Sequence, residues 1–352
     1  MALLTTLINI YYNIVRYFMS LIFFFGITGS LLNIILFSRQ KLRQTSCCIC
    51  MYRYSDSISS LSTLFSVDFL AASFSSLLSL LFGLIPTFYL LNNVYPGNYS
   101  VVFCKMQGYI THTSLQMTRV LLVLACFDRY ALSSSSSYLR KFATVSIARR
   151  CVPVVMLSCY LIAIHLIIYL DVVNSSCGIY QLSVLIYNSV YSIATISITM
   201  PLLMFIFSFL TFVNLKQRQK KRQQMNSAAI HRDIIRDKKV FFTLLVQLLL
   251  YFISTGLYAP NIIYTTITQN MPKSSDQQVI GLFINAFALL LIYIYPGFSF
   301  LAFTVSSKTF RRELFNLRKL FPFYCVRRTA VLPYTTTNRR MNTNDATNNQ
   351  TF

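Results

Sequence analysis

Seven long apolar blocks restrict what this chain can fold into. They fall near residues 17–38, 69–91, 104–130, 151–171, 184–213, 240–264 and 279–304. Each has the length of about 20 residues that a helix needs to cross the hydrocarbon core of a membrane. Because lipid offers no partners to backbone N–H and C=O groups, each block must be helical. The blocks therefore predict an all-α membrane protein, a seven-transmembrane helix bundle.

The composition excludes several other classes. The chain is 55% hydrophobic and 11% charged, whereas soluble domains contain about 25% charged residues. A net charge of +22 could indicate nucleic-acid binding, but the basic residues lie between apolar blocks, so we expect membrane lipid and no nucleic acid. The sequence contains no phosphate loop, metalloprotease motif or hydrolase motif. We therefore expect no enzyme activity, no cofactor and no metal.

The positions of Lys and Arg predict the orientation of the chain. If the N-terminus is outside, nearly all of the 31 basic residues fall in inner loops and in the C-terminal tail. Only Arg16, Lys105 and Lys273 then lie outside, and Arg119 lies within the third block. Basic residues concentrate on the cytoplasmic side of membrane proteins. This distribution predicts an extracellular N-terminus and a cytoplasmic C-terminus.

Cysteines and glycosylation motifs fit this orientation. Cys104 opens the third block and Cys177 lies in the loop between the fourth and fifth blocks. Both would face an oxidising compartment, where a disulfide is chemically permitted; two unrelated thiols are the alternative. Asn98 and Asn174 begin Asn-x-Ser motifs in outer loops, where we expect glycosylation.

The third block ends in Asp128-Arg129-Tyr130, 25 residues after Cys104 when counted to the arginine. This arrangement resembles the rhodopsin-like G-protein-coupled receptors, whose third helix begins with a disulfide cysteine and ends in Asp-Arg-Tyr. The resemblance implies a disulfide between Cys104 and Cys177. It also implies that Arg129 is restrained by Asp128 at rest and meets a heterotrimeric G-protein when the sixth span moves outward.

Further motifs extend the resemblance over almost the whole chain. They are the helix-core positions Asn33, Ser76, Pro201, Pro260 and Pro296. The chain departs from the family in having no Trp, so the tryptophans of spans four and six are absent. The chain is most similar to divergent invertebrate neuropeptide (FMRFamide-like) receptors, which implies a multi-pass protein of the plasma membrane.

A surplus segment precedes the second span. Asp68 would lie at the inner edge of that span, so we align Ser76 with the family's span-two aspartate. Residues 51–66 are then extra, and removing these 16 residues brings Asn33 and Ser76 close to the family's spacing. We interpret 51–66 as an insertion, the translation of a retained intron.

The resemblance also divides the chain. It implies a short extracellular N-terminus (1–16), the seven-span domain (17–304), an amphipathic eighth helix lying on the membrane (305–320) and a polar cytoplasmic tail (321–352). Cys325 precedes two arginines, which suits palmitoylation beside an anionic leaflet. Ser and Thr runs suggest phosphorylation sites for an arrestin-like desensitising partner.

Three residues of the third span are candidates for a ligand pocket. Thr111 and His112 lie in its outer third, where the family binds ligands. Amine receptors place an Asp near this level, and this chain has Thr111 there, so we expect a peptide ligand rather than an amine. Arg119 lies at mid-span, where a charge indicates function; it either contacts ligand or holds spans three, four and five together. A seven-span transporter or channel is the alternative to a receptor, although the halves show no matching broken spans.

Overall fold

The computed structural model describes residues 2–38, 59–142, 145–223, 242–243, 245–268, 271–306, 310–312 and 314–315. The chain divides into two units, Met1–Glu313 and Leu314–Phe352, and the account below concerns the first. It contains seven helices long and apolar enough to cross a membrane: Leu4–Leu36, Asp68–Tyr89, Val101–Ser133, Arg150–Tyr169, Leu182–Lys220, Leu245–Ile267 and Ser275–Val305. The structure thus confirms a helical bundle of multi-pass membrane character, while the orientation of its ends stays a prediction.

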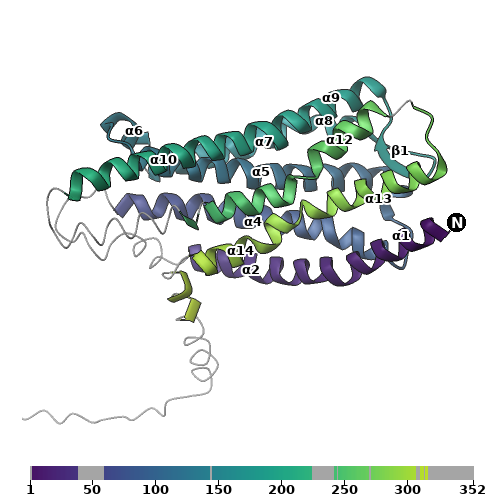
Figure 1. The fold of residues 1–352 in the computed structure, drawn as a ribbon, viewed down its shortest axis with the longest axis horizontal. Coiled ribbons are helices and arrows are strands. Elements are labelled where there is room, and N and C mark those ends of the chain that lie inside the picture. The colour runs from purple at the N-terminus through teal and green to yellow at the C-terminus, as the bar shows by residue number, and fades with distance from the viewer. Residues whose placement is uncertain are drawn as a thin grey trace, which may run out of the picture. The chain divides into compact units, whose positions relative to one another are not determined.

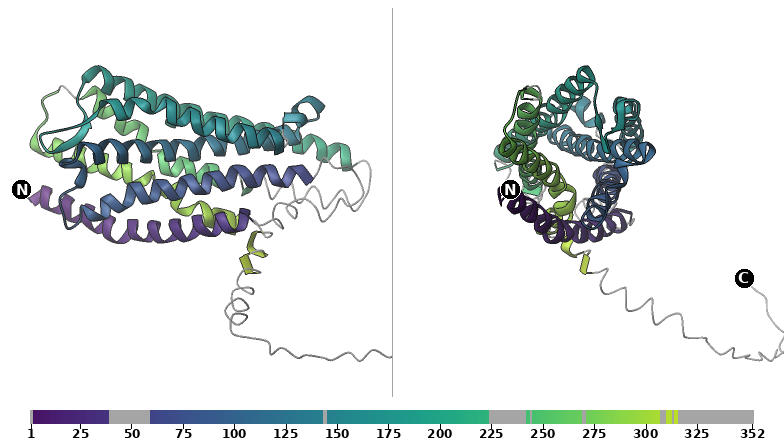
Figure 2. Two further views of the ribbon diagram at one scale, coloured as in Figure 1. Left: turned by 180° about the vertical axis from the view of Figure 1, so that it is seen from behind. Right: turned by 90° about the vertical axis from the view of Figure 1, so that its right-hand side faces the viewer.

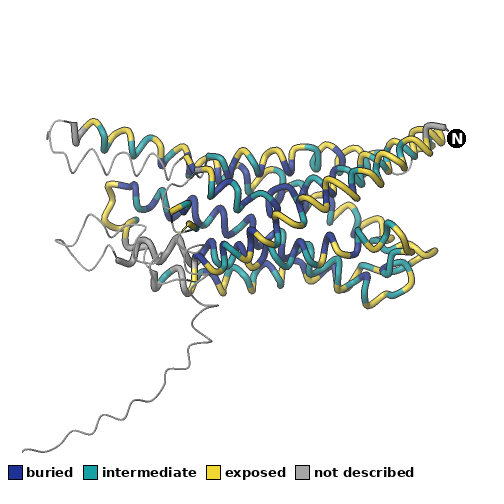
Figure 3. The backbone as a smooth tube through the Cα atoms, turned by 90° about the horizontal axis from the view of Figure 1, so that it is seen from below, coloured by how far each residue is buried: buried dark blue, intermediate teal, exposed yellow. Residues whose placement is uncertain are grey.

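The second and third spans are the most enclosed of the seven, and the third holds the candidate residues. It is a single helix, α5 (Val101–Ser133), and its buried residues include charged and polar ones. Its packing partners are α4 (Ser59–Tyr89), α7 (Val145–Ile162), α8 (Ile164–Tyr169) and α10 (Met200–Gln223). Figures 1 and 2 show these helices running side by side along the bundle. In Figure 3, buried residues gather in its middle, whereas exposed apolar residues cover its outside, as a lipid-facing surface requires.

The first span is longer than the sequence indicated. α1 (Ala2–Asn13), the π-helical segment η1 (Ile14–Met19) and α2 (Ser20–Ser38) follow one another without a break. Residues 2–16, expected as an extracellular terminus, are therefore helical. Within this continuous helix the side chain of Arg16 is exposed, while its neighbour Val15 is fully buried.

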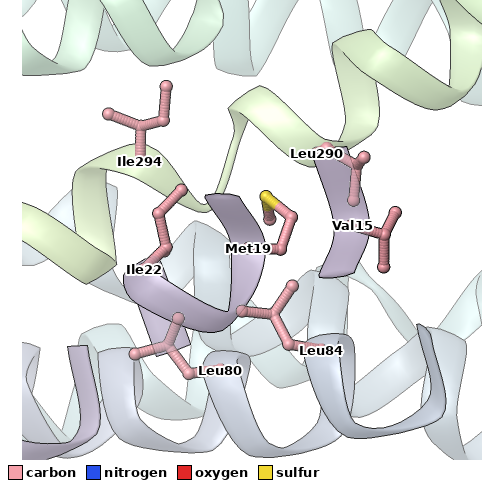
Figure 4. Close-up of a cluster of buried hydrophobic side chains, with 7 residues drawn as sticks. All are labelled: Val15, Met19, Ile22, Leu80, Leu84, Leu290 and Ile294. Atoms are coloured by element: carbon pink, nitrogen blue, oxygen red, sulfur yellow. The ribbon is translucent and has the colours of Figure 1, made fainter. Parts of the chain in front are cut away.

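Small residues and aliphatic side chains pack the first span against its neighbours. Val15, Met19 and Ile22 meet residues of α4, α13 (Ser275–Leu291) and α14 (Ile294–Ser306) in the cluster of Figure 4. A Cβ built on Gly26 would lie 3.0 Å from the Cα of Gly297. Such close backbone approach between membrane helices needs small residues.

Spans five, six and seven are each interrupted beside a proline. Pro201 follows the π-helical segment η4 (Ile193–Thr199). Pro260 lies in the first turn of α12 (Tyr258–Ile267), after a turn at residues 256–257. Pro296 lies in the first turn of α14, after a turn at residues 292–293. Proline has no N–H to donate and its ring crowds the preceding turn, so helices kink or restart there.

Two predicted segments are described only in part. The insertion at 51–66 lies partly outside the described residues, but 59–66 are helical as the start of α4, so the second helix begins earlier than the span expected at 69–91. The eighth helix expected at 305–320 is not confirmed, because most of that range lies outside the described residues.

Candidate functional site

One end of the bundle is closed by a disulfide-linked hairpin (Figure 1). β1 (Leu170–Val173) pairs antiparallel with β2 (Ser176–Ile179), and Val173 faces Ser176 across a two-residue turn. The turn residues Asn174 and Ser175 have φ angles of 50° and 56°, which match the turn that best fits the twist of a hairpin.

The predicted bridge is present. Cys104, in the first turn of α5, is joined to Cys177 of β2 with a Cα–Cα distance of 5.8 Å. It holds the hairpin against the end of α5. Asn174 is exposed at the hairpin tip and Asn98 is half-buried in η3 (Pro96–Asn98); their glycosylation stays a prediction.

Arg119 lies at the middle of α5 and is only 4% exposed. The hydrogen bond of its guanidinium runs from Nη1 to Oε1 of Gln116, one turn away on the same helix, at 3.4 Å. It also interacts electrostatically with His112 and with four tyrosines: Tyr191, Tyr251, Tyr258 and Tyr293. This group of four tyrosines, the tyrosine shell of Arg119, could not be predicted from the sequence, because its members come from spans five, six and seven.

His112 and Thr111 lie nearer the disulfide end. The ring of His112 packs 5.8 Å from that of Tyr191 in α9 (Leu182–Ser192). The Nε2 of His112 and the Oγ1 of Thr111 are enclosed without a hydrogen-bond partner. The structure therefore brings His112 and Arg119 around one residue, Tyr191. For Thr111 no contact with this group is observed.

His165 of α8 contacts the same tyrosine, Tyr191. Its ring packs 5.4 Å from Tyr191 and 5.3 Å from Tyr187. Its two nitrogens lie 3.0 Å from the carbonyl of Ile162 and 3.3 Å from Oδ1 of Asn188. These contacts fit a packing role, because both nitrogens have partners.

A tyrosine of span six compensates for the proline of span five. In the π-helical pattern of η4, the N–H of Met200 bonds the carbonyl of Thr195. The next donor would be Pro201, which has no N–H, so the carbonyl of Ile196 needs another partner. The hydroxyl of Tyr251 donates to that carbonyl at 2.5 Å, and Tyr251 is 1% exposed. Spans five and six are thereby joined at the kink.

The other end of α5 holds the Asp-Arg-Tyr motif. Asp128 is 6% exposed, and Asp68 of α4 is 1% exposed. Each carboxyl group interacts electrostatically with the other and with Arg129. One arginine therefore has two acidic neighbours. The sequence placed Asp68 at this end of its span but gave no indication that it faces Asp128.

Span five covers the end of α5. Tyr130 and Phe127 pack on Phe207, with ring centroids 6.0 and 5.3 Å apart. Arg218 donates from Nη2 to the carbonyls of Leu132 and Ser134 at 3.1 and 2.9 Å. A cation at a helix C-terminus satisfies the free carbonyls and favours the helix dipole. The inner part of span six that would meet Arg129 lies mainly outside the described residues, as does Cys325.

The helix-core residues have separate places. Asn33 and Ser76 are buried on the adjoining helices α2 and α4, and the Oδ1 of Asn33 is enclosed without a hydrogen-bond partner.

No family model and no curated protein matches this chain.

Proposed function

We propose that this chain is a rhodopsin-like G-protein-coupled receptor of the plasma membrane. It would bind an extracellular ligand, a peptide rather than an amine, and activate a heterotrimeric G-protein. The seven-helix architecture fits a receptor and a transporter or channel equally. The observation that favours the receptor is the buried Asp128 beside Arg129, on the same helix whose other end bears the Cys104–Cys177 bridge.

The proposed mechanism is a two-state equilibrium that a ligand shifts by binding one state more tightly. In the resting state Arg129 is restrained by its acidic neighbours. An arginine keeps its charge and presents a planar fork of donors, so once released it can bind a G-protein. The interruption of span six before Pro260 supplies a position where that span can bend outward.

Signal termination would use the cytoplasmic tail. Its Ser and Thr residues would be phosphorylated to recruit an arrestin-like partner, and palmitoylation of Cys325 would hold its first part at the membrane. The amphipathic eighth helix at 305–320 belongs to the same proposal. These parts lie mainly outside the described residues.

The deciding experiment compares two activities of the full chain in liposomes. Guanine-nucleotide exchange on a panel of heterotrimeric G-proteins should rise above that of empty liposomes, and Arg129→Ala should abolish the rise. Solute flux across the same liposomes should stay at background. Flux without nucleotide exchange would reject the receptor and favour the transporter or channel.

A further inference from the structure

Arg119 is a buried cation without a counter-charge from the described residues. Of the four acidic side chains described, Asp68 and Asp128 adjoin Arg129, and Asp171 and Asp276 are exposed. No salt bridge of Arg119 occurs within the described part of the chain, and its hydrogen bond goes to Gln116. A guanidinium has five N–H donors, so most of its donor capacity is left for another molecule.

The contacts of Arg119 do not support a role in holding helices together. Its hydrogen-bond partner Gln116 is on the same helix. The neighbouring tyrosines use their hydroxyl groups elsewhere: Tyr251 donates to Ile196, and Tyr258 hydrogen-bonds the side chain of Ser192. A residue that joined helices would hydrogen-bond across them, and Arg119 does not do so among the described residues.

The surroundings of Arg119 suit an organic anion. The ring of Tyr191 packs against that of His112, both residues interact electrostatically with Arg119, and the enclosed Nε2 of His112 is available as a second polar contact. An arginine fork matches the two oxygens of a carboxylate, and the resulting pair is strongest where water is excluded. An organic anion beside Tyr191 and His112 would use all these features.

We infer that Arg119 binds the carboxylate of the ligand, so that the ligand is an organic acid. This inference rests on the proposed receptor function and names the ligand class of that site. Arg119 lies 15 residues beyond Cys104, which is about 22 Å along the helix. The part of the ligand that reaches it must therefore be narrow. A small carboxylic acid and the free C-terminus of an extended peptide both meet this requirement.

The same contact would transmit binding to span six. Tyr251 and Tyr258 lie on either side of the interruption at residues 256–257, and both interact electrostatically with Arg119. A carboxylate that draws the guanidinium toward the ligand changes its interaction with both tyrosines. The break in span six is thus the first structure to respond to the ligand.

The first test measures thermal unfolding of the full chain purified in a neutral detergent without ligand. A charge kept unpaired for a ligand destabilises the unliganded protein, so Arg119→Gln should raise the Tm by about 1–2 °C, the shift that corresponds to about 1 kcal/mol in a chain of this size. Arg150→Gln, at an exposed position, is the matched control and should leave the Tm unchanged. A lower Tm of Arg119→Gln, or its failure to fold, would overturn the inference, because a structural arginine predicts that result.

The second test adds matched probes at millimolar concentration. They are octanoate and octanamide, phenylacetate and phenylacetamide, and an N-acetylated Phe-Leu peptide as free acid and as amide. At least one acid should raise the Tm of the wild type and of Arg150→Gln, its amide should not, and Arg119→Gln should lose the effect. A response to the small acids identifies a small ligand, and a response to the peptide acid alone identifies a peptide C-terminus.

Several outcomes of the probe experiment would refute a carboxylate site. They are equal effects of acid and amide, an effect that persists in Arg119→Gln, an equal effect of sodium chloride at the same ionic strength, or no effect of any acid. These measurements use no G-protein. Their failure leaves the nucleotide-exchange test unaffected, and success without exchange would describe a carboxylate-binding membrane protein that is not a receptor.

Discussion

Two arginines on α5 have opposite surroundings. Arg129 has two acidic neighbours, Asp68 and Asp128, whereas Arg119, ten residues earlier, has tyrosines, His112 and Gln116. The two lie about 15 Å apart along the helix. Two carboxyl groups of the chain adjoin one cation, whereas none of the described acidic side chains adjoins the other. This difference separates an internal restraint from a site that needs an outside anion.

The energetic consequence differs between the two arginines. A charge in the middle of a membrane helix costs about 3 kcal/mol on insertion scales. Arg129 lies near the end of its span, where this cost is smaller, and movement of the helices away from Asp128 would remove its electrostatic partner. At Arg119 the cost is met only when an anion arrives. Under the two proposals above, ligand binding at the middle of α5 would supply free energy for the release of Arg129 near its end.

The largest expected effect concerns the side of the membrane on which each end of the chain lies. If the end with the disulfide hairpin is extracellular, a tag before Ala2 should be reached by antibody on intact cells. A tag after Phe352 should be reached only after permeabilisation. Surface labelling of both tags would mean an even number of spans, and labelling of the C-terminal tag alone would place Arg129 on the outer side.

Replacing Arg129 by Lys should show whether the planar guanidinium is needed at this position or only its positive charge. We expect Arg129→Lys to lose most nucleotide exchange, at least about tenfold, because an ammonium does not reproduce the planar donors of a guanidinium. Arg150→Lys, on the exposed surface, should keep wild-type exchange at equal surface density. Wild-type exchange in Arg129→Lys would show that only the charge at this position matters.

The acids beside Arg129 should act as restraints. Asp128→Asn should raise basal nucleotide exchange about fivefold, since loss of about 1 kcal/mol of resting-state stabilisation changes a two-state ratio by that factor. Asp68→Asn alone should raise it less, because Asp128 remains adjacent to Arg129. If Asp68 is a second partner, the double variant should exceed Asp128→Asn; equality of the two would exclude Asp68 from the restraint.

The sequence predicted the positions of the helices better than it predicted which side of each helix packs against its neighbours. Hydropathy located seven spans because a membrane demands long apolar helices, but the first helix begins at Ala2, earlier than the block expected at 17–38. Hydropathy did not show that Asp68 faces Asp128, because the rotation of a helix about its own axis depends on packing. The topology put Cys104 and Cys177 in the same compartment, and the resemblance implied the bridge that the structure contains.

The tyrosine shell of Arg119 lay beyond sequence reasoning for a related reason. Tyr251, Tyr258 and Tyr293 are three of 23 tyrosines, and nothing in their local sequence sets them apart. Pro201 did provide a clue, because a proline within a span always leaves a carbonyl without its usual donor. Which residue satisfies that carbonyl depends on how span six lies against span five, and only the structure shows it.

The smallest expected effect tests the contact between the two regions. Tyr251 interacts with Arg119 and also joins span six to the carbonyl of Ile196 in span five. Outward movement of span six must break that hydrogen bond if the bond belongs to the resting state. Tyr251→Phe removes the hydroxyl and keeps the ring, and a neutral hydrogen bond contributes about 0.5–1.5 kcal/mol net. Because part of this lost free energy destabilises the resting and the active state equally, we expect basal exchange to rise only about twofold.

The matched control is Tyr17→Phe, a tyrosine exposed on the first span, which should leave basal exchange unchanged. Basal exchange is normalised to surface density, so that an effect on folding is separated from one on the equilibrium. Combining Tyr251→Phe with Asp128→Asn then shows whether the two restraints act on one movement. Multiplication of their effects would mean that the kink at Pro201 and the acids beside Arg129 hold the same resting state independently. An unchanged or lowered basal exchange in Tyr251→Phe would mean that the bond persists in the active state, and span six would then have to move together with span five.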